Sequence, residues 1–332
     1  MPERLNGGNL VGGGALASLT AAFRPHAGRR FALLDFPDHP NVGDSAIWIG
    51  ELALFREAGG AAPAYVSAFH NLDDADLRAA VPEGPIFLHG GGNFGDVWNH
   101  HQDFREGVIA RFRDRPIIQL PQSIHFRDPA RIAQAARVIA AHPDFTLLVR
   151  DLPSLKLAEQ QFDCTVRLCP DSALAIGSVR PAPARCEVLA LLRTDRESAG
   201  ALRTPPGVPV EDWLIEETGP VRRAKAAAAI GAWTSGRPRL ARVRAYEAAA
   251  RHRLERGLGQ IARGRALVTD RLHVHILALL LGRPHAVIDN SYGKIGRFLD
   301  AFTGGSPLVH RATSLDAALA WAQAAATAQE AA

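Results

Sequence analysis

Apolar residues along this chain gather in short runs, and each run is followed by a segment in which they recur every three or four positions. The runs are typical of buried strands in a parallel sheet, and the periodic segments are typical of helices that cover it. Because strands and helices alternate, we predict an α/β fold with parallel, doubly wound sheets. The expected strands are residues 31–36, 65–69, 85–93, 116–125, 146–151, 186–193, 266–268 and 285–290, and the first half ends near Asp171. The expected helices are residues 45–58, 72–80, 131–141, 154–161, 222–229, 239–260, 271–281 and 315–326.

The clearest strand–turn–helix unit lies at residues 266–285, where the helix is expected over 271–281. Asp270, Arg271 and His273 follow its strand directly, at the sheet edge where open α/β sheets bind ligands. A turn with only a structural role would not need these groups. We therefore predict that this corner carries the active site.

The motif contains a second histidine, His275, two positions after His273. Residues two apart on a helix point about 200° away from each other, so both cannot face one ligand. We expect one histidine to be functional and the other to be packed or exposed. A zinc site is the less favoured alternative, because a helical metal pair prefers a spacing of four.

The pattern also divides the chain into parts. A proline-rich stretch without apolar periodicity, residues 175–186, predicts the domain boundary, and the poorly patterned region 197–220 is a candidate lid. The expected parts are a flexible lead at 1–28 with a short helix, an N-terminal domain at 29–178, a C-terminal domain at 186–310, and a terminal helix at 311–332 that packs back on the N-terminal domain.

Neutral polar, acidic and aromatic groups follow the strands of the first half. Asn41 and Asp44 flank a glycine, and they can either cap the next helix or bind sugar hydroxyls. The glycine run after the third strand exposes backbone N–H groups suited to an anion or a sugar. We interpret His100 and His101 as surface residues, with a place in the cleft as the alternative. The candidate acceptor-binding set is Asn41, Asp44, Gly91, Gly92, Asn93, Asp96, Trp98 and Gln122.

The strand ends of the second half carry cationic or protonatable groups: Arg193, Arg271, His273 and Lys294. Arginine pairs with both carboxylate and phosphate through its planar fork, so this half is expected to bind an anionic donor. An alternative structural role for Arg271 is an ion pair with Asp270 or Asp289. Lys294 is not part of a Walker loop, because that motif is absent.

The composition limits which partners and which cellular compartment we expect for the protein. The chain carries 38 basic and 34 acidic residues, which fits a phosphorylated substrate or an anionic membrane surface better than nucleic acid. The start lacks the order of a signal peptide, and three cysteines leave one unpaired in any disulfide scheme. We expect a cytoplasmic protein, with peripheral contact at the inner membrane face as an open alternative. The arginines of 239–260 are interpreted as a solvated helix face, with phospholipid headgroups as the alternative partner.

Three stretches resemble the polysaccharide pyruvyl transferase family: N-V-G-D-S-A-I at 41–47, L-H-G-G-G-N-F-G-D-V-W at 88–98, and V-T-D-R-L-H-V-H-I-L-A-L-L-L-G-R-P-H at 268–285. The resemblance implies two Rossmann-like domains facing a central cleft, as in GT-B-like glycosyltransferases. It also implies transfer of pyruvate from phosphoenolpyruvate onto two hydroxyls of a sugar in an exopolysaccharide or cell-surface glycan precursor, giving a cyclic ketal.

The resemblance further implies residue roles and partners. His273 matches the family's catalytic and donor-binding histidine, and Arg193 matches another donor-binding position. Arg271 joins them as a catalytic and donor-binding candidate from its place in the unit. The partners would be phosphoenolpyruvate as co-substrate and a sugar or lipid-linked oligosaccharide, without metal or other cofactor.

Two other functions stay open. A GT-B-type glycosyltransferase would need an acidic residue for a nucleotide's ribose after a second-half strand, and the sequence has no clear candidate. A non-catalytic sugar-binding subunit of a polysaccharide assembly system is less favoured, because the cationic corner is complete.

Overall fold

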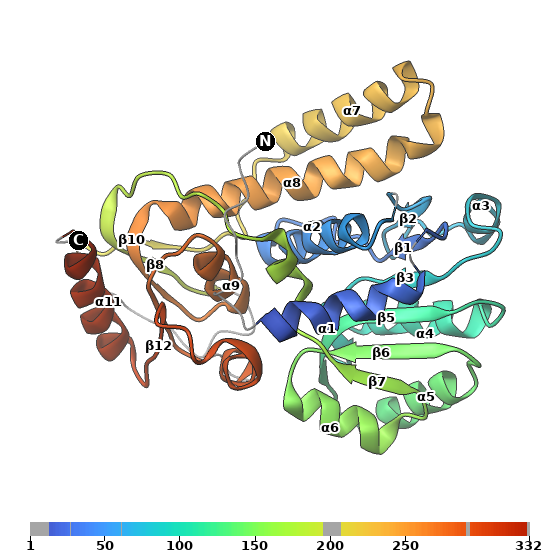
Figure 1. Cartoon of the computed structure of the whole chain (residues 1–332), viewed down its shortest axis with the longest axis horizontal. Helices are drawn as coiled ribbons and strands as arrows, with labels where there is room; N and C mark the ends of the chain where they lie inside the picture. The colour runs from blue at the N-terminus through green and yellow to red at the C-terminus, as the bar shows by residue number, and fades with distance from the viewer. Residues whose placement is uncertain (1–12, 27, 61, 195–206, 290–292, 331–332) are drawn as a thin grey trace.

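The computed structural model describes residues 13–330 except 27, 61, 195–206 and 290–292. Two parallel sheets lie beside each other, with helices around both (Figure 1). The predicted α/β fold with parallel sheets is therefore confirmed, whereas the specific two-domain glycosyltransferase arrangement stays a prediction. No helix in the described ranges is long and apolar enough to cross a membrane.

The first sheet has the strand order β2-β1-β3-β5-β6-β7, and β4 pairs with β5 off this path. Its strands are β1 (Ala32–Leu34), β2 (Tyr65–Ser67), β3 (Ile86–Leu88), β4 (Gly91–Gly95), β5 (Ile117–His125), β6 (Phe145–Val149) and β7 (Thr165–Leu168). The helices of this half are α1 (Gly13–Phe23), α2 (Val42–Glu57), α3 (Asp74–Ala80), α4 (Asn99–Arg111), α5 (Pro129–Ala140) and α6 (Leu152–Gln161).

The second sheet has the order β12-β11-β10-β8-β9 and is also parallel. Its strands are β8 (Cys186–Leu191), β9 (Val210–Glu211), β10 (Gly264–Thr269), β11 (His285–Val287) and β12 (Val309–Arg311). The helices are α7 (Thr218–Thr234), α8 (Ala241–Ala262), α9 (Leu272–Leu280), α10 (Lys294–Phe298) and α11 (Leu315–Glu330).

Helix α2 joins the two sheets. It packs against α8, α9 and the 3₁₀ turn Ser172–Ile176, and one buried apolar cluster runs from the first sheet through α2 to the second. Two glycines allow this close packing: a Cβ at Gly50 would lie 1.9 Å from the Ser172 carbonyl oxygen, and one at Gly257 would lie 2.3 Å from Val42. The N-terminus of α2 is thereby held against both halves.

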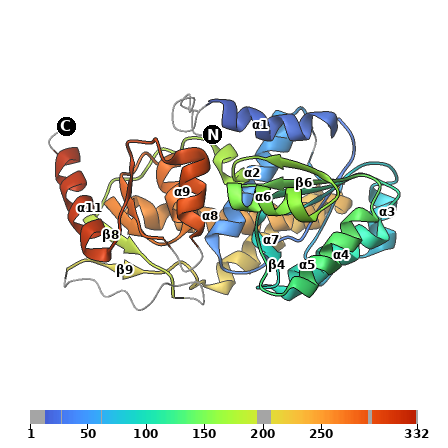
Figure 2. The same cartoon turned by 90° about the horizontal axis from the view of Figure 1, so that it is seen from below.

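One expectation about the less regular parts is wrong. The terminal helix does not pack on the N-terminal domain, because α11 contacts β8, β10, β11 and β12 through its buried Ala318, Ala322 and Ala326 (Figure 2). The short helix expected in the lead is present as α1, which buries Leu19 and Phe23 in the core.

The candidate lid stays a prediction. Residues 197–206 lie outside the described residues, but the rest of the region is anchored rather than loose. It contains β9, the buried Trp213 and the start of α7.

Candidate functional site

A pocket of about 310 Å³ lies where the carboxyl ends of the two sheets face each other. Five of the residues that line it follow strands by one or two positions. Asp35 follows β1, His89 follows β3, Arg150 follows β6, Arg193 follows β8 and Arg271 follows β10. Parallel strands bring their carboxyl ends to one edge, so residues far apart in sequence meet here.

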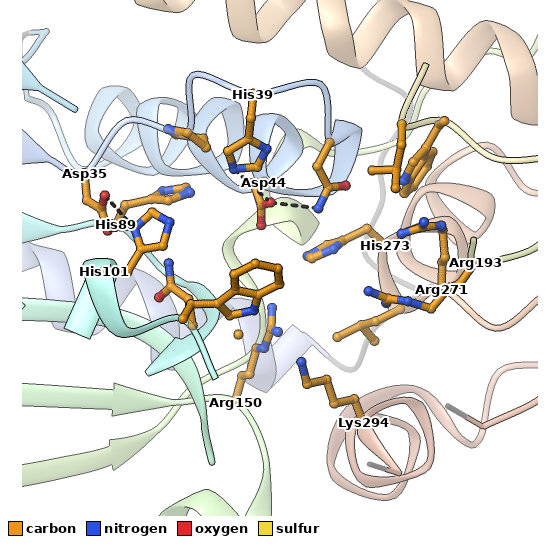
Figure 3. A pocket seen from close by; sticks show the side chains of 18 of the residues that line it. Asp35, His39, Asp44, His89, His101, Arg150, Arg193, Arg271, His273 and Lys294 are labelled. Carbon is orange, nitrogen blue, oxygen red and sulfur yellow. Dashed lines mark hydrogen bonds and ion pairs between the residues drawn. The ribbon is translucent and has the colours of Figure 1, made fainter. Parts of the chain in front are cut away.

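Nine of the twelve predicted site residues line this pocket, and three do not (Figure 3). The nine are Asn41, Asp44, Gly92, Asn93, Trp98, Arg193, Arg271, His273 and Lys294. The other three, Gly91, Asp96 and Gln122, are not part of the pocket lining but lie close to it in the chain or in space. Gly91 adopts φ +131, which favours glycine. The buried Gln122 donates to the His89 carbonyl and to Asn93 Oδ1, at 3.1 and 2.9 Å. Asp96 accepts from the backbone N–H groups of Arg127 and Asp128, both at 2.7 Å.

The N-terminus of α2 forms one wall. Asn41 caps the helix by accepting from the Gly43 N–H at 3.1 Å, and it also donates to Asp44 Oδ2 at 2.8 Å, so capping and a place in the pocket occur together. Gly43, the glycine between Asn41 and Asp44, lets the backbone come close to a neighbouring group. Its close neighbour is His273, whose Nδ1 would lie 2.3 Å from a Cβ at that position.

Histidines surround the Asp44 carboxyl. Burial works to raise its pKa, but His39, whose Nε2 lies 3.5 Å away, His273, His89 and His101 outweigh burial and lower it. Asp44 therefore stays a carboxylate that can accept a hydrogen bond from a hydroxyl in the pocket.

Asp171 lies beside His273 on a second side, with its Oδ2 at ion-pair distance, 3.4 Å, from the imidazole Nε2, which is buried without a hydrogen-bond partner in the described part of the chain. Asp171 is fully buried and pairs with Arg150. Burial works to raise the pKa of Asp171, but Arg150 and then His273 lower it overall. The imidazole of His273 is thus placed by a fixed carboxylate while its ring lines the pocket.

His275 behaves differently, as the helical geometry predicts. Its Nδ1 lies 2.7 Å from His285 Nε2 and its Nε2 lies 2.9 Å from Thr303 Oγ1, and it is fully buried. Burial, and then His285, lowers its pKa well below the ordinary value. The two imidazoles of the motif do not converge on one ligand, and the described ranges contain no group of three or more His, Cys, Asp or Glu arranged to hold a metal ion.

Two histidine–carboxylate pairs lie in the first-half wall, which is the part of the pocket formed by residues before the domain boundary. The sequence alone did not predict either pair. His89 Nδ1 lies 2.8 Å from Glu51 Oε2, and Glu51 Oε1 accepts from the Gly90 N–H at 2.8 Å. Burial would lower the pKa of His89, but Glu51 and nearby Asp residues raise it overall. Its other nitrogen, Nε2, is buried without a hydrogen-bond partner in the described part of the chain, and the residue lines the pocket.

The second pair corrects an expectation. His101 is not a surface residue, because its side chain is nearly buried and its Nδ1 lies 2.9 Å from both carboxylate oxygens of Asp35. Asp35 follows β1 with φ +70, a strained conformation for a residue with a Cβ. His100, by contrast, is exposed but also lines the pocket.

Cations form the second-half wall. Arg271 donates to Asp212 Oδ2 at 2.6 Å, and both side chains are nearly buried, so among the described residues its ion pair is with Asp212 rather than with Asp270 or Asp289. Asp270 instead accepts from the Arg193 backbone N–H at 2.7 Å and fixes that strand end. Arg150, which follows β6 of the first sheet, meets Lys294 of this wall at Gly92, where a Cβ would lie 3.4 Å from Lys294 Nζ and 2.9 Å from Arg150.

Residues 41–292 match the sequence model of the family described as polysaccharide pyruvyl transferase. The chain belongs to this family. It is 32% identical over 298 residues to "Pyruvyl transferase 1" of Schizosaccharomyces pombe, covering 84% of this chain and 71% of that protein. It is 30% identical over 280 residues to "Putative pyruvyl transferase EpsO" of Bacillus subtilis, covering 82% and 85%.

An uncharacterized protein of Klebsiella pneumoniae has a similar fold, with a TM-score of 0.62 at 18% identity over 90% of this chain and 99% of that chain. Among the predicted site residues, only Lys294 lies outside the part that matches the pyruvyl transferase family. The family match thus contains most of the pocket lining, including the histidine–carboxylate pair of His89 and Glu51, whereas Asp35, Pro37, His39 and Lys294 lie outside it.

Proposed function

We propose that the chain transfers pyruvate from phosphoenolpyruvate onto two hydroxyls of one sugar in an exopolysaccharide or cell-surface glycan precursor. The products are a cyclic ketal and free phosphate. One observation carries this proposal: a wall of cations faces a wall of histidines and carboxylates across a pocket of small-molecule size.

The cationic wall fits the donor. Phosphoenolpyruvate has a carboxylate and a phosphate, and arginine can bind either group with two parallel hydrogen bonds. Arg193 and Arg271 come from the second sheet, whereas Arg150 and Lys294 meet beside Gly92. We assign the donor to this group of four cations and place His273 beside its methylene carbon.

The opposite wall fits a sugar. Asp44 supplies a carboxylate oxygen, and Asn93 supplies the N–H groups of its amide, because its Oδ1 already accepts from Arg105 and Gln122. Trp98, 39% exposed, presents an aromatic face on which a sugar ring can stack. A nucleotide-sugar donor is less well supported. Trp213, the aromatic residue of the second-half wall, is 1% exposed and has Arg271 over its ring at 5.9 Å, so its face is not open to a base.

The reaction removes two protons, one from each sugar hydroxyl, and delivers two, one to the methylene carbon and one to the departing phosphate. His273 gives a proton to the methylene carbon, C2 gains oxocarbenium character, and a sugar hydroxyl forms the first C–O bond as its proton leaves. The C2–O bond to phosphate then breaks, and the second hydroxyl closes the ketal ring as it loses its proton. His89, backed by Glu51, is our candidate acceptor of these hydroxyl protons, because the residue lines the pocket and its Nε2 has no hydrogen-bond partner among the described residues. No metal or further cofactor enters this scheme.

The test incubates purified protein with phosphoenolpyruvate and candidate glycans, and measures released phosphate together with product mass. We expect phosphate and a pyruvylated glycan in equal amounts. Phosphate release without a pyruvylated product, or glycosyl transfer from a UDP- or GDP-sugar, would contradict the proposal.

A further inference from the structure

The positive charge of the chain is concentrated in the hairpin of α7 and α8. The 29 residues between Glu217 and Glu247 carry seven of the 38 basic residues and none of the 34 acidic ones. The rest of the chain, with 31 basic and 34 acidic residues, is slightly acidic. This hairpin is therefore the part of the surface most attractive to an anionic partner.

Helix α7 is the outermost layer on its side of the molecule. It packs on α8, and α8 in turn packs on α2 (Figure 1). Its outer face exposes Ile230 and Trp233, which are 62% and 66% exposed, and these share a helix face with the exposed Ala226. Large apolar side chains this exposed are not needed by the fold, so they mark a contact surface.

Cations flank this apolar stripe at both ends. Arg222 and Arg223 lie near the start of α7, and Arg237 and Arg239 lie in the turn that follows it. All four are exposed, and within the described ranges none has an acidic partner within ion-pair distance. Lys225, in contrast, already pairs with Asp38 at 2.7 Å.

We propose that the outer face of α7, with the turn to α8, docks the protein on an anionic phospholipid surface. Tryptophan suits the boundary between headgroups and acyl chains, isoleucine inserts below it, and arginines bind headgroup phosphates. A nucleic acid would engage the arginines but would leave the isoleucine and alanine stripe without a role. The surface is near the pocket in sequence: α7 begins four residues after Leu214, which lines the pocket.

The experiment is co-sedimentation of the full chain with vesicles of phosphatidylcholine alone and with vesicles rich in phosphatidylglycerol. We expect binding to the phosphatidylglycerol vesicles only, and weaker binding as salt is raised. The double variant Ile230→Ser/Trp233→Ser should bind about tenfold more weakly. Each of Arg222→Gln and Arg237→Gln should weaken binding about fivefold.

Matched controls are Leu152→Ser, an apolar residue 49% exposed on α6, and Arg113→Gln, an exposed arginine outside the hairpin. Both should bind like the wild type, and circular dichroism melting should show all variants folded. Absence of vesicle binding, equal binding to both vesicle types, or binding unchanged in Ile230→Ser/Trp233→Ser would overturn the proposal. So would a change of oligomeric state in that double variant, or binding to duplex DNA as tight as to the anionic vesicles.

Discussion

The two walls of the pocket are built on opposite principles. In the first-half wall, histidines are paired with carboxylates of the same half, as His89 is with Glu51 and His101 with Asp35. In the second-half wall, cations gather, and the carboxylate of Asp212 balances Arg271 from within the wall. A histidine that is oriented by a carboxylate can transfer protons, whereas a cluster of cations binds an anionic substrate. Under the proposed function, phosphoenolpyruvate therefore lies against the cations, and the sugar lies against the histidines and carboxylates.

The strongest test of this division compares the two histidines of one helix. His273→Ala should lower transfer about 10²–10⁴-fold while leaving the melting temperature nearly unchanged, because it removes a proton donor from a pocket wall. His275→Ala should instead lower the free energy of unfolding by about 1–3 kcal/mol, because it leaves His285 without its hydrogen-bond partner. The transfer activity per folded molecule should stay as in the wild type. Steady-state rates and thermal melts of both variants would decide it, and a fully active His273→Ala would remove this residue from the reaction.

A change at Glu51, which contacts His89 but does not line the pocket, should lower the rate of transfer and leave donor binding unchanged. Glu51→Gln keeps an oxygen for the Gly90 N–H but removes the charge that raises the pKa of His89. We expect kcat to fall about 10²-fold and its pH dependence to move toward lower pH, because the imidazole loses its stabilising carboxylate. The matched measurement is stabilisation by phosphoenolpyruvate, which should stay as in the wild type. An unchanged pH profile would exclude His89 from proton transfer.

The contact between the walls can be disturbed at one glycine. A Cβ at Gly43 would lie 2.3 Å from His273 Nδ1, so Gly43→Ala should displace the imidazole and lower kcat about tenfold or more. The control is Gly259→Ala on α8, where nothing lies within 4 Å of the added Cβ. That variant should be fully active and about 0.5–1 kcal/mol more stable. Equal activity of the two variants would show that the position of His273 does not depend on Gly43.

The smallest expected effect concerns acid stability. Burial lowers the pKa of His285 to about 4, so this group stays neutral in the folded protein while it protonates in the unfolded chain below about pH 6.5. Between these values the unfolded state binds more protons, so stability is full above pH 6.5 and falls as the pH drops toward 4. His285→Gln should therefore lose less melting temperature between pH 7 and pH 5 than the wild type. An equal or greater loss would contradict this assignment.

The sequence predicted the strand ends well because they follow apolar runs directly. Arg193, Arg271 and His273 could be found in this way, since each follows a strand of the second sheet. Arg150 also ends a predicted strand, but nothing in the sequence links it to Asp171 or to His273. That link exists only once the strands are placed side by side.

Other site residues carried weaker signals. Glu51 lies in an apolar part of α2, where a charged residue suggests a buried partner, but the partner itself follows from tertiary contacts. Asp212 lies in a region without pattern. The alanine stripe of α11 predicts a helix that packs closely, yet it does not say on which sheet, and the expected partner was the wrong one.

The central claim is that the cationic wall binds phosphoenolpyruvate, and thermal stabilisation by ligands tests it most directly. A ligand that binds only the folded state raises the melting temperature. We predict a rise with phosphoenolpyruvate, none with UDP- or GDP-sugars, and loss of the rise in Arg193→Ala. A rise with a nucleotide sugar and none with phosphoenolpyruvate would contradict the account and assign the pocket to glycosyl transfer.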